Sequence, residues 1–467
     1  MSVPISLLFR SHRPKGGENV FCVGTCASDG IEWGNPTMER TDILEIYVVR
    51  SGDTLYNIAR RYSVSTDDIT YANQLQNPAV LSVGQALVIP IARRVYTVRR
   101  GDTMYAIARS FGVSLASLIA ANPAISDPNR IYVGQQINIP SQSEYLGEMV
   151  VNGYVTDATD ATLSATLPYL TFLSPFSYRS DLSGKLTPDF NLNTSLSAGQ
   201  RVANLMTVTN LKAQGGFSSE IAHAILTDQT VQDTFLGNVE TALARGGYYG
   251  LNIDFEYVYQ YDRQSYNRFL QRVTDRLHSL GYLVATALAP KLSDDQQGLL
   301  YSAHDYAFHG KVADYVILMT YEWGYTYGPA MAVSPINMVR RVLDYAVQVI
   351  PAGKILMGVP NYGYNWTLPF VQGTAAQPLT NVGAVTLAGQ VGAAIQFDQT
   401  AQSPFFRYYD SAGRQHEVWF EDARSLQAKY RLVKEYGLAG VSFWNLNTLF
   451  RTNFLVLESM YSVEKVL

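Results

Sequence analysis

Cysteine is scarce in this 467-residue chain, which contains only Cys22 and Cys26. One Cys-x3-Cys pair without further cysteines is a weak metal signal and cannot build a disulfide framework. The six histidines, among them His304, His309 and His416, show no ligand spacing with acids or cysteines. We therefore expect no metal and no other cofactor.

Long apolar runs are missing as well. No run approaches the length needed to span a bilayer, so we expect no membrane partner. The opening MSVPISLLFRSHRPKGG has too short an apolar run, followed at once by arginine, to be a classical signal peptide. Charged residues make up 16% of the chain, the formal net charge is -4, and no basic stripe occurs. We therefore expect that the protein does not bind nucleic acid. We also expect a monomer, although nothing in the sequence bears on the oligomeric state.

The N-terminal part shows no hydrophobic period. We expect residues 1–43 to form an extension without regular structure. Because ordered patterning begins just after Met38, our hypothesis is that Met38 is the natural start. A peptide from residues 1–37 in the native protein would contradict it.

An internal repeat follows this extension. YVVRSGDTLYNIARRYSVSTDDITYAN begins at Tyr47, and YTVRRGDTMYAIARSFGVSLASLIAAN begins at Tyr96, 49 residues later. Each copy continues through Gly-Gln to an apolar strand that ends in proline. The pattern predicts two units of strand, helix, helix and strand, at residues 46–91 and 95–141.

Polar residues mark the helix ends within each unit. Asp53 and Asp102 stand where a helix N-cap belongs, and we expect their carboxylates to accept the free N–H groups of the first turn. Asn73 and Asn122 stand at the ends of the second helices, where asparagine tolerates the left-handed conformation.

Both units closely resemble the LysM module along their whole length. The resemblance implies binding to polymers that contain N-acetylglucosamine, in a groove between the loop after the first strand and the loop before the second. In this chain the implied groove residues are Gly52, Asp53, Thr54 and Leu55 with Pro78 and Ala79, and Gly101, Asp102, Thr103 and Met104 with Asp127 and Pro128. If Asp53 and Asp102 only cap helices, the loop backbone would bind the sugar.

The remaining residues, 148–467, alternate between apolar segments and helical stretches. Eight such segments indicate an α/β fold, a (β/α)8 barrel, with chemistry at the C-terminal ends of the strands. Residues 366–435 are too long for one crossover helix, and FFRYYDSAGRQHEVWFED within them predicts a hairpin, so we expect a small insertion there. The expected strands are Met149–Tyr154, Tyr169–Tyr178, Val202–Leu211, Leu251–Tyr257, Leu283–Pro290, Tyr315–Trp323, Ile355–Tyr362 and Gly440–Leu446.

The fourth expected strand, in GYYGLNIDFEYV, carries acids where strands rarely have them. Side chains alternate along a strand, so Asn252, Asp254 and Glu256 share one face while the apolar residues between them share the other. Burying two carboxyl groups is costly, which points to a function at the barrel mouth. Because both acids come from one wall, neither is well placed to attack the opposite face of a sugar ring. The nucleophile must then come from elsewhere, and a substrate's own N-acetyl oxygen can supply it.

YGLNIDFE resembles the Asp-x-x-Asp-x-Asp-x-Glu signature of family 18 glycoside hydrolases, whose catalysis is substrate-assisted. The resemblance implies that Glu256 is the general acid and that Asp254 orients the N-acetyl group and stabilises the cyclic intermediate. Asn252 and Tyr249 stand where the signature has two further aspartates. One negative charge beside Asp254 is therefore missing, which should weaken the coupling that raises a neighbour's pKa.

Further motifs of this family follow in the expected order. LMTYEW resembles the motif on strand six, which makes Tyr321 a donor to the acetyl carbonyl and places Glu322 where an aspartate is usual. GVPNYGYNW resembles the strand-seven motif, with Tyr362 lining the cleft or packing in the core. GVSFWNLN puts Trp444 where the family has an indole floor beneath the reacting sugar.

The combination of modules predicts a retaining glycosidase that cleaves β-linked N-acetylglucosamine and is tethered to its polymer. Two LysM units ahead of such a barrel resemble the spore germination and cortex-lytic N-acetylglucosaminidases of endospore-forming bacteria. That resemblance implies spore cortex peptidoglycan as the substrate and the spore coat or cortex as the location. The alternatives are a chitinase and, in another class, a non-catalytic glycan-binding protein resembling a lectin.

Overall fold

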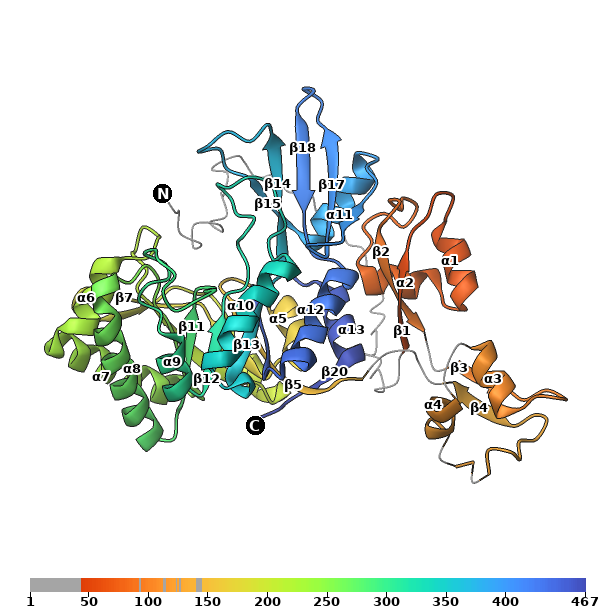
Figure 1. The fold of residues 1–467 in the computed structure, drawn as a ribbon, viewed down its shortest axis with the longest axis horizontal. Helices are drawn as coiled ribbons and strands as arrows, with labels where there is room; N and C mark the ends of the chain where they lie inside the picture. Colours follow the sequence, from red (N-terminus) through yellow and green to blue (C-terminus); the bar gives the residue numbers. More distant parts are fainter. Residues whose placement is uncertain (1–42, 92–93, 112–114, 123, 126, 140–144) are drawn as a thin grey trace, which may run out of the picture.

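The structure is a computed structural model that describes residues 43–467, apart from 92–93, 112–114, 123, 126 and 140–144 (Figure 1). The expectations for residues 1–42, including a start at Met38 and the pair Cys22 and Cys26, lie outside the described residues. No helix in the described part is long and apolar enough to cross a membrane.

A closed parallel barrel forms the largest part of the molecule. Each of the eight expected strands is present, and the last pairs with the first through Val441 and Val151. In barrel order the strands are β5 (Gly147–Val155), β6 (Phe172–Pro175), β9 (Ala203–Thr209), β10 (Gly250–Asp254), β11 (Leu283–Leu288), β12 (Tyr315–Leu318), β13 (Ile355–Pro360) and β19 (Gly440–Trp444). The predicted (β/α)8 fold is therefore confirmed.

Helices connect and surround these strands (Figure 1). Their apolar faces pack on the outward side chains of the barrel; Phe255, for example, contacts the rings of Phe235 and Phe269, with centroids 6.1 and 5.9 Å away. The helices are α5 (Asp160–Thr166), α6 (Ser219–Thr227), α7 (Gln229–Gly246), α8 (Arg263–Ser279), α9 (Tyr306–Val312), α10 (Ile336–Val349), α12 (Ala423–Tyr436) and α13 (Arg451–Met460). Short strands β7 (Tyr178–Ser180), β8 (Leu186–Pro188) and β20 (Tyr461–Val463) extend the sheet.

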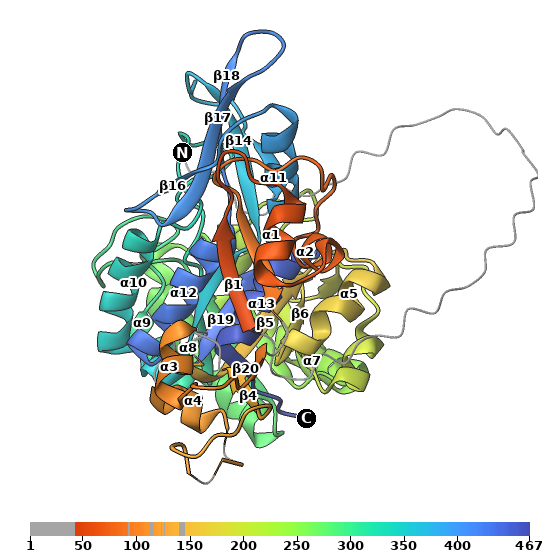
Figure 2. The ribbon, with the colours of Figure 1, turned by 90° about the vertical axis from the view of Figure 1, so that its right-hand side faces the viewer.

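An antiparallel sheet with one helix is inserted between β13 and α12, and it projects from the barrel in both views (Figures 1 and 2). Its hairpin turns between Tyr409 and Gln415, around the expected Ser-Ala-Gly. The elements are β14 (Tyr362–Leu368), β15 (Gln377–Thr380), α11 (Asn381–Gln390), β16 (Gln396–Asp398), β17 (Ser403–Tyr409) and β18 (Gln415–Trp419), in sheet order β15-β14-β18-β17-β16. The part of 366–435 from Ala423 onward belongs to helix α12.

The two N-terminal units each have the predicted strand–helix–helix–strand order. In the first, Leu55, Ile58 and Ala59 bury the inner face of the first helix, and Met104, Ile107 and Ala108 do the same in the second. The elements are β1 (Ile43–Val48), α1 (Leu55–Tyr62), α2 (Thr66–Asn73) and β2 (Ala86–Ile91), then β3 (Arg94–Thr97), α3 (Met104–Ser110), α4 (Leu115–Ala120) and β4 (Gln136–Ile139).

The helix caps differ from the prediction. Thr54 and Thr103, not Asp53 and Asp102, are the N-caps of α1 and α3; their hydroxyls accept from the N–H groups of residues 57 and 106 at 3.2 and 3.1 Å. Since the helices begin one residue later than expected, each aspartate falls inside the preceding loop.

Asn73 and Asn122 do not adopt the left-handed conformation expected of them. After α2 that conformation belongs to Gln74, with φ of 50°. The Asn73 amide donates to the carbonyls of Ile69 and Val88 at 2.8 and 2.7 Å and accepts from the Val88 N–H at 2.7 Å. Asn122 makes the matching bonds to Leu118 and Asn138. Each asparagine therefore ties a second helix to the following strand.

The first LysM unit is packed against the barrel. It lies beside α12 and α13, whereas the second unit lies apart from them (Figure 1). The Gln74 side-chain amide donates to the Leu449 carbonyl at 3.1 Å and accepts from the Arg451 N–H at 2.6 Å, both in the barrel domain. On the insertion side, the Ile395 N–H donates to the Val83 carbonyl at 2.8 Å.

Candidate functional site

Strand β10 divides its side chains as predicted. Leu251, Ile253 and Phe255 are completely buried among the surrounding helices. Asp254 points into the barrel mouth, and Glu256 joins it from two residues beyond the end of the strand. The strand therefore ends earlier than expected, but its alternation carries both acids to one cavity.

The cavity is formed at the C-terminal ends of several barrel strands, where this fold concentrates its chemistry. The residues that line it are Tyr154, Phe176, Phe217, Asp254, Glu256, Met319, Tyr321 and Trp444. The two acids are the only charged groups among them. The site thus combines two carboxyl groups with an aromatic wall, which suits a ligand with both apolar faces and polar edges.

Burial controls the protonation of the two acids. Asp254 and Glu256 are 4% and 2% exposed, and burial raises the pKa of Asp254 to about 7. Burial, reinforced by the charges of Asp254 and Glu322, raises the pKa of Glu256 well above its usual range. In the described structure, Asp254 Oδ1 and Glu256 Oε2 have no hydrogen-bond partner. Burial therefore favours a form of the pair that retains a proton.

Tyr321 and Trp444 lie beside the acids, at the ends of β12 and β19. Burial raises the pKa of Tyr321 well above its usual range, so its hydroxyl remains a hydrogen-bond donor. Trp444 is partly exposed, and its ring meets those of Tyr154 and Phe176 edge-on with centroids 5.5 and 4.7 Å away. An indole held in this way offers a fixed apolar surface to a ligand.

The remaining predicted barrel residues lie around the cavity without lining it. Asn252 is fully buried, and its amide donates to the Tyr154 hydroxyl at 2.6 Å. Glu322 accepts hydrogen bonds from Tyr362 and, at 2.9 Å, from Tyr364. Burial raises the pKa of Glu322 to about 7, although these two hydrogen bonds oppose the shift. The insertion strand β14 therefore supplies both partners of this carboxyl group.

The LysM loops use their aspartates internally. Asp53 accepts from the Tyr47 hydroxyl and the Arg50 N–H, both at 2.7 Å, and these bonds hold its pKa below the usual range. Asp102 makes the same bonds to Tyr96 and Arg99. Gly52 and Gly101 adopt φ of 85° and 91°, a conformation that favours glycine. Hydrogen bonds within each loop fix its shape and occupy the aspartate side chains. A ligand would therefore have to contact the loop backbone or other side chains of the loop.

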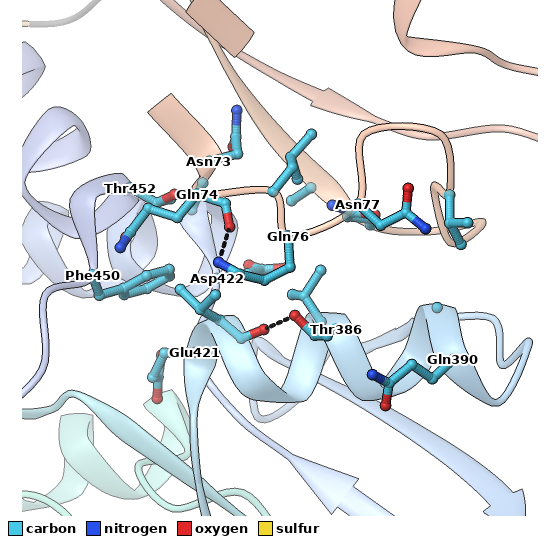
Figure 3. A pocket seen from close by; sticks show the side chains of 18 residues that line it. Asn73, Gln74, Gln76, Asn77, Thr386, Gln390, Glu421, Asp422, Phe450 and Thr452 are labelled. Carbon is cyan, nitrogen blue, oxygen red and sulfur yellow. Dashed lines mark hydrogen bonds between the residues drawn. The ribbon is translucent and has the colours of Figure 1, made fainter. Parts of the chain in front are cut away.

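A second cavity opens where the first LysM unit meets α11 and α12 (Figure 3). It contains two acids, but neither is available for chemistry: Glu421 is paired with Lys429 at 2.8 Å and Asp422 with Arg424 at 2.6 Å. In the described part of the chain, no group of three or more His, Cys, Asp or Glu side chains could hold a metal ion.

Several residues of the site escape sequence reasoning. Phe176 and Phe217 line the cavity from loops that carry no motif, and Tyr364 reaches Glu322 from the insertion. Asn210 and His304 contact the main chain around Glu256 from distant segments. Tyr364 stands within the motif GVPNYGYNW, but nothing in that motif indicates its bond to Glu322.

Comparisons with known proteins agree with this geometry. Residues 204–448 match the glycosyl hydrolases family 18, and residues 47–90 and 96–140 match the LysM domain. The chain is 44% identical to the cortical fragment-lytic enzyme of Bacillus subtilis (strain 168), over 90% of this chain and 99% of that protein.

Solved structures give the same answer. The crystal structure of the Bacillus megaterium QM B1551 spore cortex-lytic enzyme SleL is similar with a TM-score of 0.80 at 40% identity, covering 91% of this chain and 100% of that one. A chitinase from Chromobacterium violaceum ATCC 12472 is similar with a TM-score of 0.62 at 26% identity, covering 67% and 98%. The chain therefore belongs to the glycosyl hydrolases family 18, as a glycosidase whose barrel is preceded by two LysM domains.

Proposed function

We propose that the protein hydrolyses β-1,4 bonds of N-acetylglucosamine in spore cortex peptidoglycan, with retention of configuration and with the substrate's acetamide as the nucleophile. One observation carries the mechanism: both acids of the cavity come from the end of the same strand. No other residue lining the cavity carries a carboxyl group that could attack from the opposite face of the sugar.

Glu256 is the proposed proton donor. Its raised pKa keeps the carboxyl group protonated near neutral pH, as protonation of the glycosidic oxygen requires. As the bond to that oxygen breaks, the acetamide oxygen closes onto the anomeric carbon. Water then attacks the same carbon and passes a proton to Glu256, which returns the acid to its starting state. Two inversions at one carbon give net retention.

Asp254 and Tyr321 are the proposed partners of the acetamide. Asp254 orients the N–H group and stabilises the positive charge of the cyclic intermediate, and the Tyr321 hydroxyl donates to the acetyl oxygen. Trp444 supplies the floor beneath the reacting sugar. We propose that Glu322 and Tyr362, already hydrogen-bonded to each other, contact the neighbouring sugar. Asn252 is proposed to act indirectly, by holding the hydroxyl of Tyr154, which lines the cavity.

The LysM units are proposed to hold the glycan through the loops that contain Gly52, Asp53 and Thr54, and Gly101, Asp102 and Thr103. Tethering raises the concentration of bonds near the barrel without any new contact at the cavity. The relatives named as cortical fragment-lytic and spore cortex-lytic enzymes span almost the whole chain. They support peptidoglycan as the polymer and the spore as the location.

A chitinase is the second candidate, because solved chitinases share the barrel. The two are separated by incubating the enzyme with purified cortex fragments and with chitin oligomers, then reading product masses and reducing ends. Release of N-acetylglucosamine ends from cortex fragments supports the proposal, and release from chitin alone contradicts it. In parallel, Glu256→Gln should keep glycan binding and abolish cleavage; unchanged behaviour would mark a glycan-binding protein without catalysis.

A further inference from the structure

The main chain around Glu256 lies beyond the last rungs of the barrel ladder. Strand β10 makes its final pairings at Ile253 with β11 and at Asp254 with β9. The next residues, Phe255 and Glu256, are 0% and 2% exposed. Buried peptide groups need hydrogen-bond partners, so something other than a neighbouring strand must satisfy this segment.

Asn210, the first residue after β9, takes the place of the missing ladder. Its Oδ1 accepts from the Glu256 N–H at 3.0 Å, and its Nδ2 donates to the Glu256 carbonyl at 2.8 Å. The same Nδ2 donates to the Ser218 carbonyl at 3.0 Å. Asn210 is completely buried. One side chain therefore engages both main-chain groups of Glu256, as an antiparallel strand would.

Two further side chains hold the adjoining peptide groups. The Ala289 N–H donates to His304 Nδ1 at 3.0 Å, so the proton of this imidazole resides on Nε2, which donates to the Phe255 carbonyl at 3.0 Å. The Ser219 hydroxyl donates to the Tyr257 carbonyl at 2.5 Å. Tyr257 itself has φ of 55°. The segment is thus fixed on both sides of Glu256, including an unfavourable backbone conformation.

We propose that Asn210 is a positioning residue that sets the place of the Glu256 carboxyl group, with His304 in a supporting role. The inference rests on Glu256 as the proton donor. Proton transfer requires the acid within hydrogen-bond reach of the glycosidic oxygen, and Glu256 Oε2 has no partner in the described structure that would hold it. The position of its carboxyl group therefore depends on the main chain of Glu256, which Asn210 holds in place.

Asn210→Ala tests this directly. We expect kcat to fall about tenfold or more while KM changes less than about threefold, because the variant displaces the acid without altering the rest of the cavity. The Glu256 amide should also exchange its hydrogen faster, since its acceptor is gone. Asn453→Ala is the matched control: Asn453 is equally buried but lies on α13, where it bonds Tyr430. It should lower stability and leave kcat unchanged.

Asn210→Asp is the conservative variant. While protonated, the new carboxyl group offers the same acceptor and a single O–H donor in place of the two N–H donors of Asn210, so activity should recover in part relative to Asn210→Ala at acidic pH. When it ionises, it faces the two carbonyls that Asn210 serves, and activity should fall below that of the unaltered enzyme as pH rises. This variant carries the test if Asn210→Ala does not fold.

Two results would overturn the inference: a folded Asn210→Ala protein with kcat within about twofold of the unaltered enzyme, or an Asn210→Asp protein whose pH profile matches the original. Glu256→Gln, measured alongside, separates this outcome from failure of the proposed function. If it abolishes cleavage, Glu256 stands as the acid and the Asn210 result concerns positioning alone. If it does not, the proposed function itself fails.

Discussion

Asn252, Asp254 and Glu256 form a row of polar side chains whose burial is functional rather than stabilising. A buried carboxylate is disfavoured, so the pair Asp254 and Glu256 keeps a proton that it would lose in water. For Glu256 this is the property that a proton donor needs. Asn252, which stands where the family signature has an aspartate, adds no charge of its own beside Asp254 and Glu256.

The variant Asn252→Asp tests how far that pair depends on its neighbour. A carboxylate at position 252 adds a like charge beside Asp254, which raises the Asp254 pKa further above about 7. The active state needs Asp254 ionised, so the acidic limb of the pH–rate profile should move to higher pH. The measurement is kcat against pH for both proteins, and superimposable acidic limbs would count against this account.

At the same scale, the strand alternation was sufficient to place Asp254 and Glu256, because a period of two is a local property. Asp53 was wrongly predicted to cap the helix because the next residue, Thr54, can also act as an N-cap. The hydroxyl of Tyr47, which donates to Asp53, cannot be identified as its partner from the sequence. Asn210 and His304 could not be predicted, since their partners are 46 and 49 residues away in the chain.

At the scale of elements, the first LysM unit and the insertion meet through a backbone contact that permits only glycine. Gly84 has φ of 83°, and a Cβ there would lie 1.8 Å from the Ile395 carbonyl oxygen. Gly134, its counterpart in the second unit, has φ of 88° with nothing within 4 Å of an added Cβ. The repeat predicts both turns, but only the fold distinguishes the packed glycine from the free one.

The pair Gly84→Ala and Gly134→Ala therefore isolates this contact. Both variants carry similar backbone strain, of order 1 kcal/mol, but only Gly84→Ala forces the unit away from the insertion. We expect the Ile395 amide, which donates to Val83, to lose protection from hydrogen exchange in Gly84→Ala and to keep it in Gly134→Ala. Equal protection in the two variants would show that the contact does not hold the unit in place.

At the scale of the whole molecule, the two LysM units differ in how they pack against the barrel. Each unit has a small core of its own. The first also shares the hydrophobic core of the barrel through Ala72 and Val88. The repeat does not predict this difference, because the two units have the same sequence pattern. Only the tertiary structure shows which unit packs against the barrel.

Replacing residues 95–141 by a flexible linker should consequently spare the barrel. We expect kcat on soluble oligosaccharides to stay within about twofold, while binding to the insoluble polymer weakens by roughly tenfold or more as one tether is lost. Sedimentation with the polymer and turnover of a soluble substrate measure the two effects. A parallel loss of both would mean that the second unit supports the catalytic fold.

The central claim is that the substrate's own acetamide completes the reaction that Glu256 begins. The most direct test compares hydrolysis of purified cortex fragments with that of the same fragments after de-N-acetylation, at substrate concentrations that saturate the enzyme. The account predicts that kcat falls at least about a hundredfold when the acetyl group is removed, because among the described residues that line the cavity only Asp254 and Glu256 carry a carboxyl group, and both come from the same strand end. Hydrolysis of both substrates at equal rates would contradict it.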